Sequence, residues 1–379
     1  HLVLVGPSRG AAFYEAVTMA AASAGLQIES SVYHALEPEL PTKPFGGLLG
    51  DYRSTWTGAT GGPQWPMDTA ELLTNCRAAA VHAAEQVLTA RAEPAPYARL
   101  HTHIWETLAR RNLLQRALLI QDLAAPLDWI RQQVCAALEG GVGTVLVQLF
   151  RDEDQEECLW WLTHPGETQP LSERVEAAVA RLLEAHSPLD NSELLSEMYR
   201  SFPGILTPDE AWIMACVKSY ASPLEAGRWK INPADHSQAR ATTRNDLLSL
   251  LVSLGQRWGY DCRADQDQGS VYWAQAGRET TALTVLDSAS LCALSRQPVP
   301  AAATRVLAIL PQARQDLIRE RFERAPNLRR ELASSHWRFI YDQNLLHWTT
   351  QHETATDDLD SLVSIDPFAR EGRGQLPLL

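Results

Sequence analysis

Residues 170–233 carry the signals of three successive helices and then a short strand. Residues 171–185 place apolar side chains at helical spacing, and an Asn-Ser pair caps the start of a helix over 191–199. A Thr-Pro pair, with a glutamate two residues further on, opens a third helix over 207–220. Residues 227–231 have the composition of a strand and end at an Asn-Pro pair. The order helix, helix, helix, strand is therefore expected here.

This order within about 60 residues is that of a winged-helix module, whose third helix usually enters the major groove of DNA. We expect residues 170–233 to fold in this way, with Trp212 and Val217 buried. The apolar stripe of the third helix is expected to comprise Ala211, Met214, Ala215 and Val217. The basic residues expected on the DNA-facing side are Lys218, Arg228 and Lys230.

The other segments alternate short apolar strands with helices, which predicts a mixed α/β (α+β) fold. Residues 1–67 indicate a strand-helix-strand edge of an α/β sheet and then a Pro- and Gly-rich segment, which is either a long loop or a short hairpin around 48–56. Residues 68–169 indicate a helical domain with a small β element. Residues 234–348 indicate a small α/β module, and residues 349–379 a flexible polar tail.

Charge is unevenly distributed along the chain. The net charge of −13 argues against a protein that coats nucleic acid with its whole surface. Residues 151–200 hold twelve acidic residues against four arginines, whereas residues 300–348 hold eight arginines against five acidic residues. Arginine suits bidentate phosphate contact, so one predicted helical segment offers candidates for DNA contact, with a solvated helix face as the alternative. These candidates are Arg314, Arg319, Arg321, Arg324, Arg329 and Arg330.

Hydropathy and cysteine usage exclude several classes of protein. No apolar run approaches the roughly 20 residues that span a bilayer, so we expect no membrane association. The first residues are neither basic nor long enough for a signal peptide. The six cysteines form no Cys-x-x-Cys motif, which favours reduced thiols in a cytoplasmic protein and no metal site.

Two segments are candidates for catalysis. Residues 6–10 match Gly-x-Ser-x-Gly between a strand and a helix, so Ser8 is the nucleophile in an alternative interpretation as a serine hydrolase. Only five residues precede the motif, and a strand-to-helix turn is favoured over an elbow. Residues 259–273 resemble, in order, the core of restriction-type nucleases, where an acid on one strand and Glu-x-Lys on the next hold magnesium. Asp261 or Asp287 can imitate the first acid, but no Glu-x-Lys follows, so we expect a degenerate module.

Several strings resemble the C-terminal region of large prokaryotic amino-group DNA methyltransferases, which modify adenine N6 or cytosine N4 in restriction-modification or phage-defence systems. Residues 1–34 resemble the last hairpin of the methylase sheet. Segments 45–53, 91–101, 170–176 and 202–208 resemble stretches downstream of the catalytic domain. The resemblance implies double-stranded DNA as a partner, and a methylase or another defence subunit as a second.

The catalytic motifs of that family are absent from this chain. The base-gripping Asp-Pro-Pro-Tyr motif has its nearest match at residues 366–368, and there is no convincing Phe-x-Gly-x-Gly loop for the cofactor. Methyl transfer requires S-adenosylmethionine and a flipped base held by these elements. We therefore expect no catalytic residue and no cofactor in this chain, and S-adenosylmethionine only if its parent protein is a methylase.

The last five residues resemble the peptide by which bacterial DNA-acting proteins bind the sliding clamp. The residues expected to bind it are Gln375, Leu376, Leu378 and Leu379, with a tail that folds back on the protein as the alternative.

The preferred hypothesis is a DNA-binding, target-recognition or scaffold portion of a methyltransferase-like defence protein. An acidic interaction subunit, which binds a partner or mimics DNA, remains an alternative.

Overall fold

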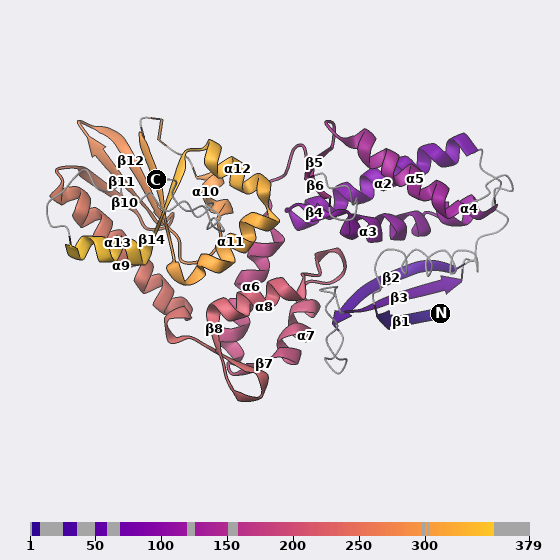
Figure 1. Cartoon of the computed structure of the whole chain (residues 1–379), viewed down its shortest axis with the longest axis horizontal. Coiled ribbons are helices and arrows are strands. Elements are labelled where there is room, and N and C mark those ends of the chain that lie inside the picture. Colours follow the sequence, from indigo (N-terminus) through magenta and orange to yellow (C-terminus); the bar gives the residue numbers. More distant parts are fainter. Residues whose placement is uncertain are drawn as a thin grey trace, which may run out of the picture. The chain divides into compact units, whose positions relative to one another are not determined.

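The chain has a mixed α/β fold (Figure 1). It divides into two compact units. This computed structural model describes residues 2–7, 26–35, 50–58, 69–119, 126–150, 158–297, 300–301 and 303–351. Unit 1 comprises His1–Val175 and Ser192–Ile213, and unit 2 comprises Glu176–Asn191 and Met214–Leu379. The division differs from the expected boundaries after residues 169 and 233, because it passes through three helices of the intervening segment, at 175/176, 191/192 and 213/214.

Three strands near the start of the chain form an antiparallel sheet in the order β1-β3-β2. They are β1 (Leu2–Pro7), β2 (Leu26–Ala35) and β3 (Gly50–Gly58). The short hairpin that was one alternative around 48–56 is instead one strand, because residues 51–57 contain no glycine or proline at which a hairpin could turn. The helix expected between β1 and β2 lies outside the described residues.

Unit 1 is mainly helical from residue 69 onward. Its helices are α2 (Thr69–Arg91), α3 (Tyr97–Arg110), α4 (Leu113–Leu119) and α5 (Pro126–Gly141). A small antiparallel sheet in the order β4-β6-β5 joins them, made of β4 (Ala95–Pro96), β5 (Leu146–Phe150) and β6 (Leu159–Leu162). The buried face of α2 is rich in alanine, which allows close helix packing around the fully buried Trp105 of α3.

The segment 171–231 contains the three expected helices and three short strands. The helices are α6 (Leu171–His186), α7 (Asn191–Ser201) and α8 (Glu210–Tyr220), with the 3-10 turn η2 (Gly204–Leu206) before α8. The strands are β7 (Leu189–Asp190), β8 (Ala221–Pro223) and β9 (Arg228–Ile231). The strands form an antiparallel sheet in the order β7-β9-β8, so β9 is central.

Helix α8 buries a different face from the one expected. Trp212 and Val217 are buried, as predicted, but Ala211 is exposed and Met214 and Ala215 are half-buried. The buried face comprises Trp212, Ile213, Cys216, Val217 and Tyr220. Residues 211–217 are apolar on every side, so their periodicity does not select a face.

Polar contacts within unit 1 connect the end of α2 to the loop before α8, and connect α8 to the start of α6. Arg91 donates to the carbonyl oxygens of Ile205 at 3.0 Å and Thr207 at 3.2 Å, and burial lowers the pKa of its guanidinium. The indole Nε1 of Trp212 donates to the carbonyl of Ser172 at 3.1 Å. These contacts place residues 204–213 in unit 1.

Unit 2 contains a five-stranded mixed sheet in the order β10-β11-β12-β13-β14. The strands are β10 (Asp261–Asp265), β11 (Ser270–Gln275), β12 (Arg278–Val285), β13 (Arg305–Leu310) and β14 (Trp337–Tyr341). The first three pair antiparallel and the last two add in parallel. The helices are α9 (Ser237–Arg257), α10 (Cys292–Arg296), α11 (Gln315–Arg324), α12 (Pro326–Ser334) and α13 (Asp342–Gln351).

Three short 3-10 turns complete unit 2: η3 (Glu225–Gly227), η4 (Pro233–Asp235) and η5 (Gln312–Arg314). Leucine, isoleucine and tryptophan side chains of α9, the sheet and α13 form the core of this α/β part. Among the residues that the structure describes, no helix combines the length and apolarity needed to cross a membrane.

Candidate functional site

Two of the nine predicted DNA-contacting residues are buried. Arg314 has 2% of its surface exposed and Arg321 has 1%, because each forms an ion pair inside unit 2. Neither guanidinium reaches solvent, so we correct their assignment from phosphate contact to structural ion pairing.

The other basic candidates lie at the surface to different degrees. Arg319 and Arg324 form ion pairs on their own helix, with Asp316 at 3.2 Å and Glu320 at 2.9 Å respectively. The remaining candidates are all exposed, and they are Lys218, Arg228, Lys230, Arg329 and Arg330. Of these, Arg228 and Lys230 share one strand.

Glu176 of α6 is the centre of the first buried polar cluster in unit 2. One carboxylate oxygen, Oε2, accepts from Nη2 of Arg321 at 2.6 Å. The other, Oε1, accepts from the hydroxyl of Tyr220 and from the backbone N–H of Ala289, both at 2.8 Å. Burial, followed by the adjacent Glu176 carboxylate, raises the pKa of Tyr220 well above its usual value. Tyr220 therefore remains a neutral hydrogen-bond donor.

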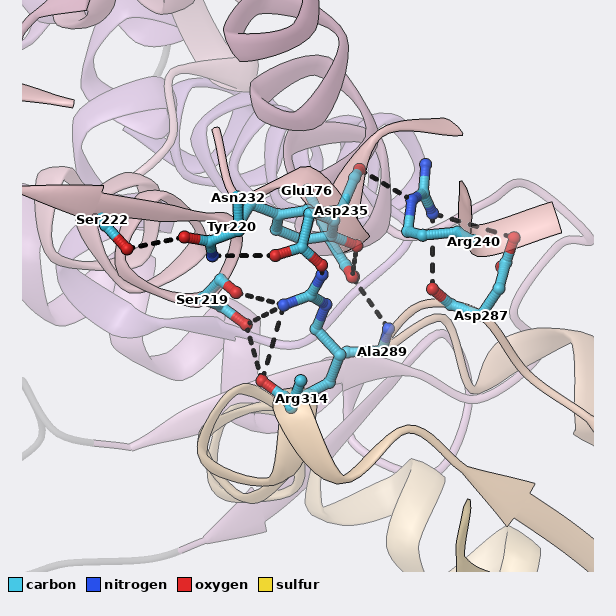
Figure 2. Close-up of polar contacts among 11 residues, drawn as sticks. Glu176, Ser219, Tyr220, Ser222, Asn232, Asp235, Arg240, Asp287, Ala289 and Arg314 are labelled. Carbon is cyan, nitrogen blue, oxygen red and sulfur yellow. Dashed lines mark hydrogen bonds and ion pairs between the residues drawn. The ribbon is translucent and has the colours of Figure 1, made fainter. Parts of the chain in front are cut away.

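Arg314, in η5, is the centre of the second cluster (Figure 2). Its Nη2 donates to Oδ1 of Asp235, and its Nη1 donates to the backbone carbonyl and the hydroxyl of Ser219. Its guanidinium also lies over the ring of Tyr220, with Cζ 3.6 Å from the centroid, as in a cation–π contact. The α/β part thereby contacts the C-terminal end of α8 and the turn after β9.

Arg240 of α9 adds a third connection between the same segments. Its Nε donates to the carbonyl of Asp235 at 3.2 Å, and its Nη1 donates to the carbonyl of Asp287 at 3.3 Å. The carboxylate of Asp287 lies 3.8 Å from the same Nη1. Asp287, considered from the sequence as a metal ligand, is thus an ion-pair partner of Arg240.

Strand β9 presents its basic residues on one face of the β7-β9-β8 sheet. Arg228 and Lys230 are exposed, whereas Ile231 is buried and Trp229 is half-buried. Trp229 donates its Nε1 hydrogen to Oδ1 of Asn191 at 2.6 Å. Because side chains alternate along a strand, Arg228 and Lys230 point to the same side, roughly 7 Å apart. We call Arg228 and Lys230 the basic face of the wing, where the wing is the β8–β9 hairpin.

The α/β sheet carries neutral polar groups where its antiparallel strands β11 and β12 meet. Ser270 and Thr284 face each other, with their hydroxyl oxygens 3.1 Å apart. The hydroxyl of Thr284 donates to Oε1 of Gln297 at 2.8 Å, and Nε2 of Gln297 donates to the hydroxyl of Ser270 at 2.7 Å. Hard divalent cations prefer carboxylate ligands, so this closed neutral ring does not fit magnesium.

The acids considered as magnesium ligands are positioned elsewhere. Asp261 begins strand β10 and is exposed. Strand β12 has one acidic residue, Glu279, which was not among the candidates and forms an ion pair with Arg263 at 2.9 Å. Within the described part of the chain, no three His, Cys, Asp or Glu side chains are grouped to hold a metal.

Five predicted site residues fall outside the described part of the chain. They are Ser8 and the tail residues Gln375, Leu376, Leu378 and Leu379, and segment 366–368 lies outside it as well. Sequence reasoning in turn missed Glu176, Asn232 and Asp235. The Asn-Pro-Ala-Asp segment 232–235 is a recognisable turn signal, but nothing local to it indicates its arginine partner.

Comparison with protein-family models, curated proteins and solved structures finds no match to this chain. The function is therefore inferred from the residues and contacts described above.

Proposed function

We propose that this chain is the DNA-binding, target-recognition or scaffold portion of a DNA methyltransferase-like defence protein, and that residues 171–231 are its winged-helix module. The observation that carries the proposal is the order α6-β7-α7-α8-β8-β9 together with the sheet order β7-β9-β8. Three helices with a three-stranded antiparallel sheet, whose last two strands form a hairpin, are the elements of a winged helix. This motif docks on duplex DNA.

The basic face of the wing supports duplex DNA as the ligand. Arg228 and Lys230 project from the central strand into solvent, and their neighbours across the ladder are Asp190 and Ser222. Contacts to phosphates position a protein on DNA, and exposed lysine and arginine side chains make those contacts that neutralise the phosphate charge. Lys218 adds a further exposed positive charge on α8.

We propose that the α/β part of unit 2 is a degenerate nuclease-like module that serves as a scaffold. The order α9, three antiparallel strands, α10 and a parallel strand favours this relationship. The neutral Ser270–Thr284–Gln297 ring argues against metal-dependent cleavage where β11 pairs with β12, because it offers no carboxylate to a metal ion. We further propose that any methyl transfer from S-adenosylmethionine depends on elements outside this chain, so the purified chain is expected to transfer no labelled methyl group to DNA.

Binding of a fluorescein-labelled 30-base-pair duplex, followed by anisotropy over about 50 to 200 mM NaCl, tests the function. The parent chain is expected to bind with a steep dependence on salt. The double variant Arg228→Ala/Lys230→Ala is expected to bind more weakly. Its slope of log K against log salt is expected to fall by about two, one for each phosphate that the variant no longer neutralises.

The matched control is Arg257→Ala/Arg278→Ala, which removes two exposed arginines from the α/β part of the same unit. It has the same net charge as the wing variant, so a general charge effect would appear equally in both. Equal losses in the two variants contradict the wing as the contact surface. A parent chain that does not bind duplex DNA contradicts the proposed function and favours the acidic interaction subunit instead.

A further inference from the structure

A continuous series of hydrogen bonds runs from the buried Arg314 to the exposed wing (Figure 2). Arg314 donates to Oδ1 of Asp235, and Oδ2 of Asp235 accepts from Nδ2 of Asn232 at 2.9 Å. The amide oxygen of Asn232 accepts from the hydroxyl of Ser222 at 2.6 Å. We name these four residues, Arg314, Asp235, Asn232 and Ser222, the Arg314 network.

The last member of the Arg314 network lies on the wing itself. Ser222 is in β8 and is the cross-strand partner of Lys230 in β9. Asn232 directly follows β9, and its backbone N–H donates to the carbonyl of Tyr220, so it extends the pairing of the hairpin by one step. The side chain of Asn232 therefore connects both strands of the wing to the turn that carries Asp235.

We propose that Arg314 is a positioning residue for the wing, acting through Asp235 and Asn232 to hold the basic face in the orientation that meets DNA. The inference rests on the proposed function only in taking duplex DNA as the ligand. Both oxygens of Asp235 are used, one by the fixed arginine and one by Asn232, so the carboxylate has a defined orientation. Arg314 in turn is held on two sides by Ser219 and the ring of Tyr220.

A positioning role and a contact role have different electrostatic signatures. Asn232 and Ser222 are uncharged, so removing either side chain from the Arg314 network does not change the number of counterions that binding releases. Loss of positioning thus lowers affinity at every salt concentration without changing the salt slope. Removal of a side chain that neutralises a phosphate changes both.

The test uses Asn232→Ala and Ser222→Ala in the 379-residue protein. Gln238→Ala is the control for the loss of an exposed side-chain amide close in sequence to Asp235. Hydrogen–deuterium exchange of residues 221–232 measures wing order without DNA. In Asn232→Ala, which removes two side-chain hydrogen bonds, exchange is expected to be about 3- to 10-fold faster. Ser222→Ala, which removes one and leaves the buried members intact, is expected to show a smaller increase. Gln238→Ala is expected to exchange as the parent does.

The same variants are then titrated with the duplex. Asn232→Ala and Ser222→Ala are both expected to bind the duplex several-fold more weakly, with the same salt slope as the parent. Unchanged exchange in Asn232→Ala overturns the proposal, as does a salt slope reduced to that of Arg228→Ala/Lys230→Ala. If the parent does not bind DNA, the proposed function fails, while the exchange result still decides whether the Asn232 and Ser222 side chains order the wing.

Discussion

Arg321 donates from Nη2 to Oε2 of Glu176 over 2.6 Å, and both side chains are almost completely buried. The two residues are 145 positions apart, so this ion pair connects α6 directly to α11. Glu176 has two further donors, Tyr220 and the N–H of Ala289. A buried carboxylate with three donors is well compensated, but it depends on all of them.

Replacement of Arg321 by methionine is expected to destabilise the protein by about 3–5 kcal/mol, because it leaves the Glu176 carboxylate buried without its counter-charge. Urea unfolding followed by circular dichroism measures the loss. The double variant Glu176→Leu/Arg321→Met is expected to be more stable than Arg321→Met alone. The control Arg319→Met removes an exposed arginine of the same helix and should change stability by less than about 0.5 kcal/mol. A similar loss in both arginine variants contradicts the expectation.

The two-residue turn between β11 and β12 has positive φ at both positions, 51° at Ala276 and 76° at Gly277. This is the geometry of a type I′ hairpin turn, which prefers Asn-Gly. Ala276→Asn is expected to stabilise the protein by about 0.5–1 kcal/mol, since alanine is strained in the left-handed region. Gly277→Ala should destabilise it through backbone strain alone, because no atom lies within 4 Å of the added methyl group. Thermal denaturation of both variants checks the two signs together.

Burial raises the pKa of the Cys76 thiol from its ordinary 9.0 to about 12. The folded chain therefore keeps a proton that the unfolded chain releases above pH 9, so this contribution to stability is present below pH 9 and is lost as the pH rises toward 12. Between pH 8 and pH 10 the parent is expected to lose about 1 kcal/mol more stability than Cys76→Ala. Urea unfolding at the two pH values measures this difference, with Thr74→Ala, an exposed change on the same helix, as the control. Parallel losses in the parent and Cys76→Ala would rule out the effect.

Gly255 of α9 allows the helix to lie close to strands β10 and β11. A Cβ at this position would lie 2.6 Å from Nε1 of Trp273 and would also overlap Sγ of Cys262. Gly255→Ala is expected to destabilise the protein by about 1–3 kcal/mol, because the surrounding core must shift. The neighbouring exposed change Gln256→Ala is expected to have little effect on the unfolding midpoint. Equal midpoints for the two variants would show that the core accommodates the methyl group.

The sequence was sufficient where one amphipathic pattern had clear ends. Helices α6 and α7 lie within one or two residues of the expected positions, and so does strand β9. Helix α8 begins at Glu210, two residues later than the Thr-Pro signal indicates. Strands β7 and β8 were missed because two or three residues are too short to show a period. Helix α13 was not predicted because its sequence is largely polar, and its last three residues fall in the segment expected to be a tail.

The site was less predictable because its partners are distant in sequence. Arg314 and Arg321 were interpreted as surface residues, since arginine is rarely buried without a partner. Their partners, Asp235 and Glu176, are 79 and 145 residues away. No local pattern connects them. Arg228 and Lys230, which need no distant partner to be exposed on a strand, were assigned to the surface from sequence alone.

The two buried ion pairs also change how the charge of the Arg-rich segment acts at a distance. Residues 300–348 have eight arginines and five acidic residues, a formal excess of three positive charges. Asp235 and Glu176 lie outside this segment and neutralise two of those charges inside the protein. An approaching polyanion therefore experiences an excess of one positive charge in this segment rather than three. Long-range attraction toward this segment is correspondingly weak, and a DNA duplex would be guided to this chain mainly by charges that protrude elsewhere.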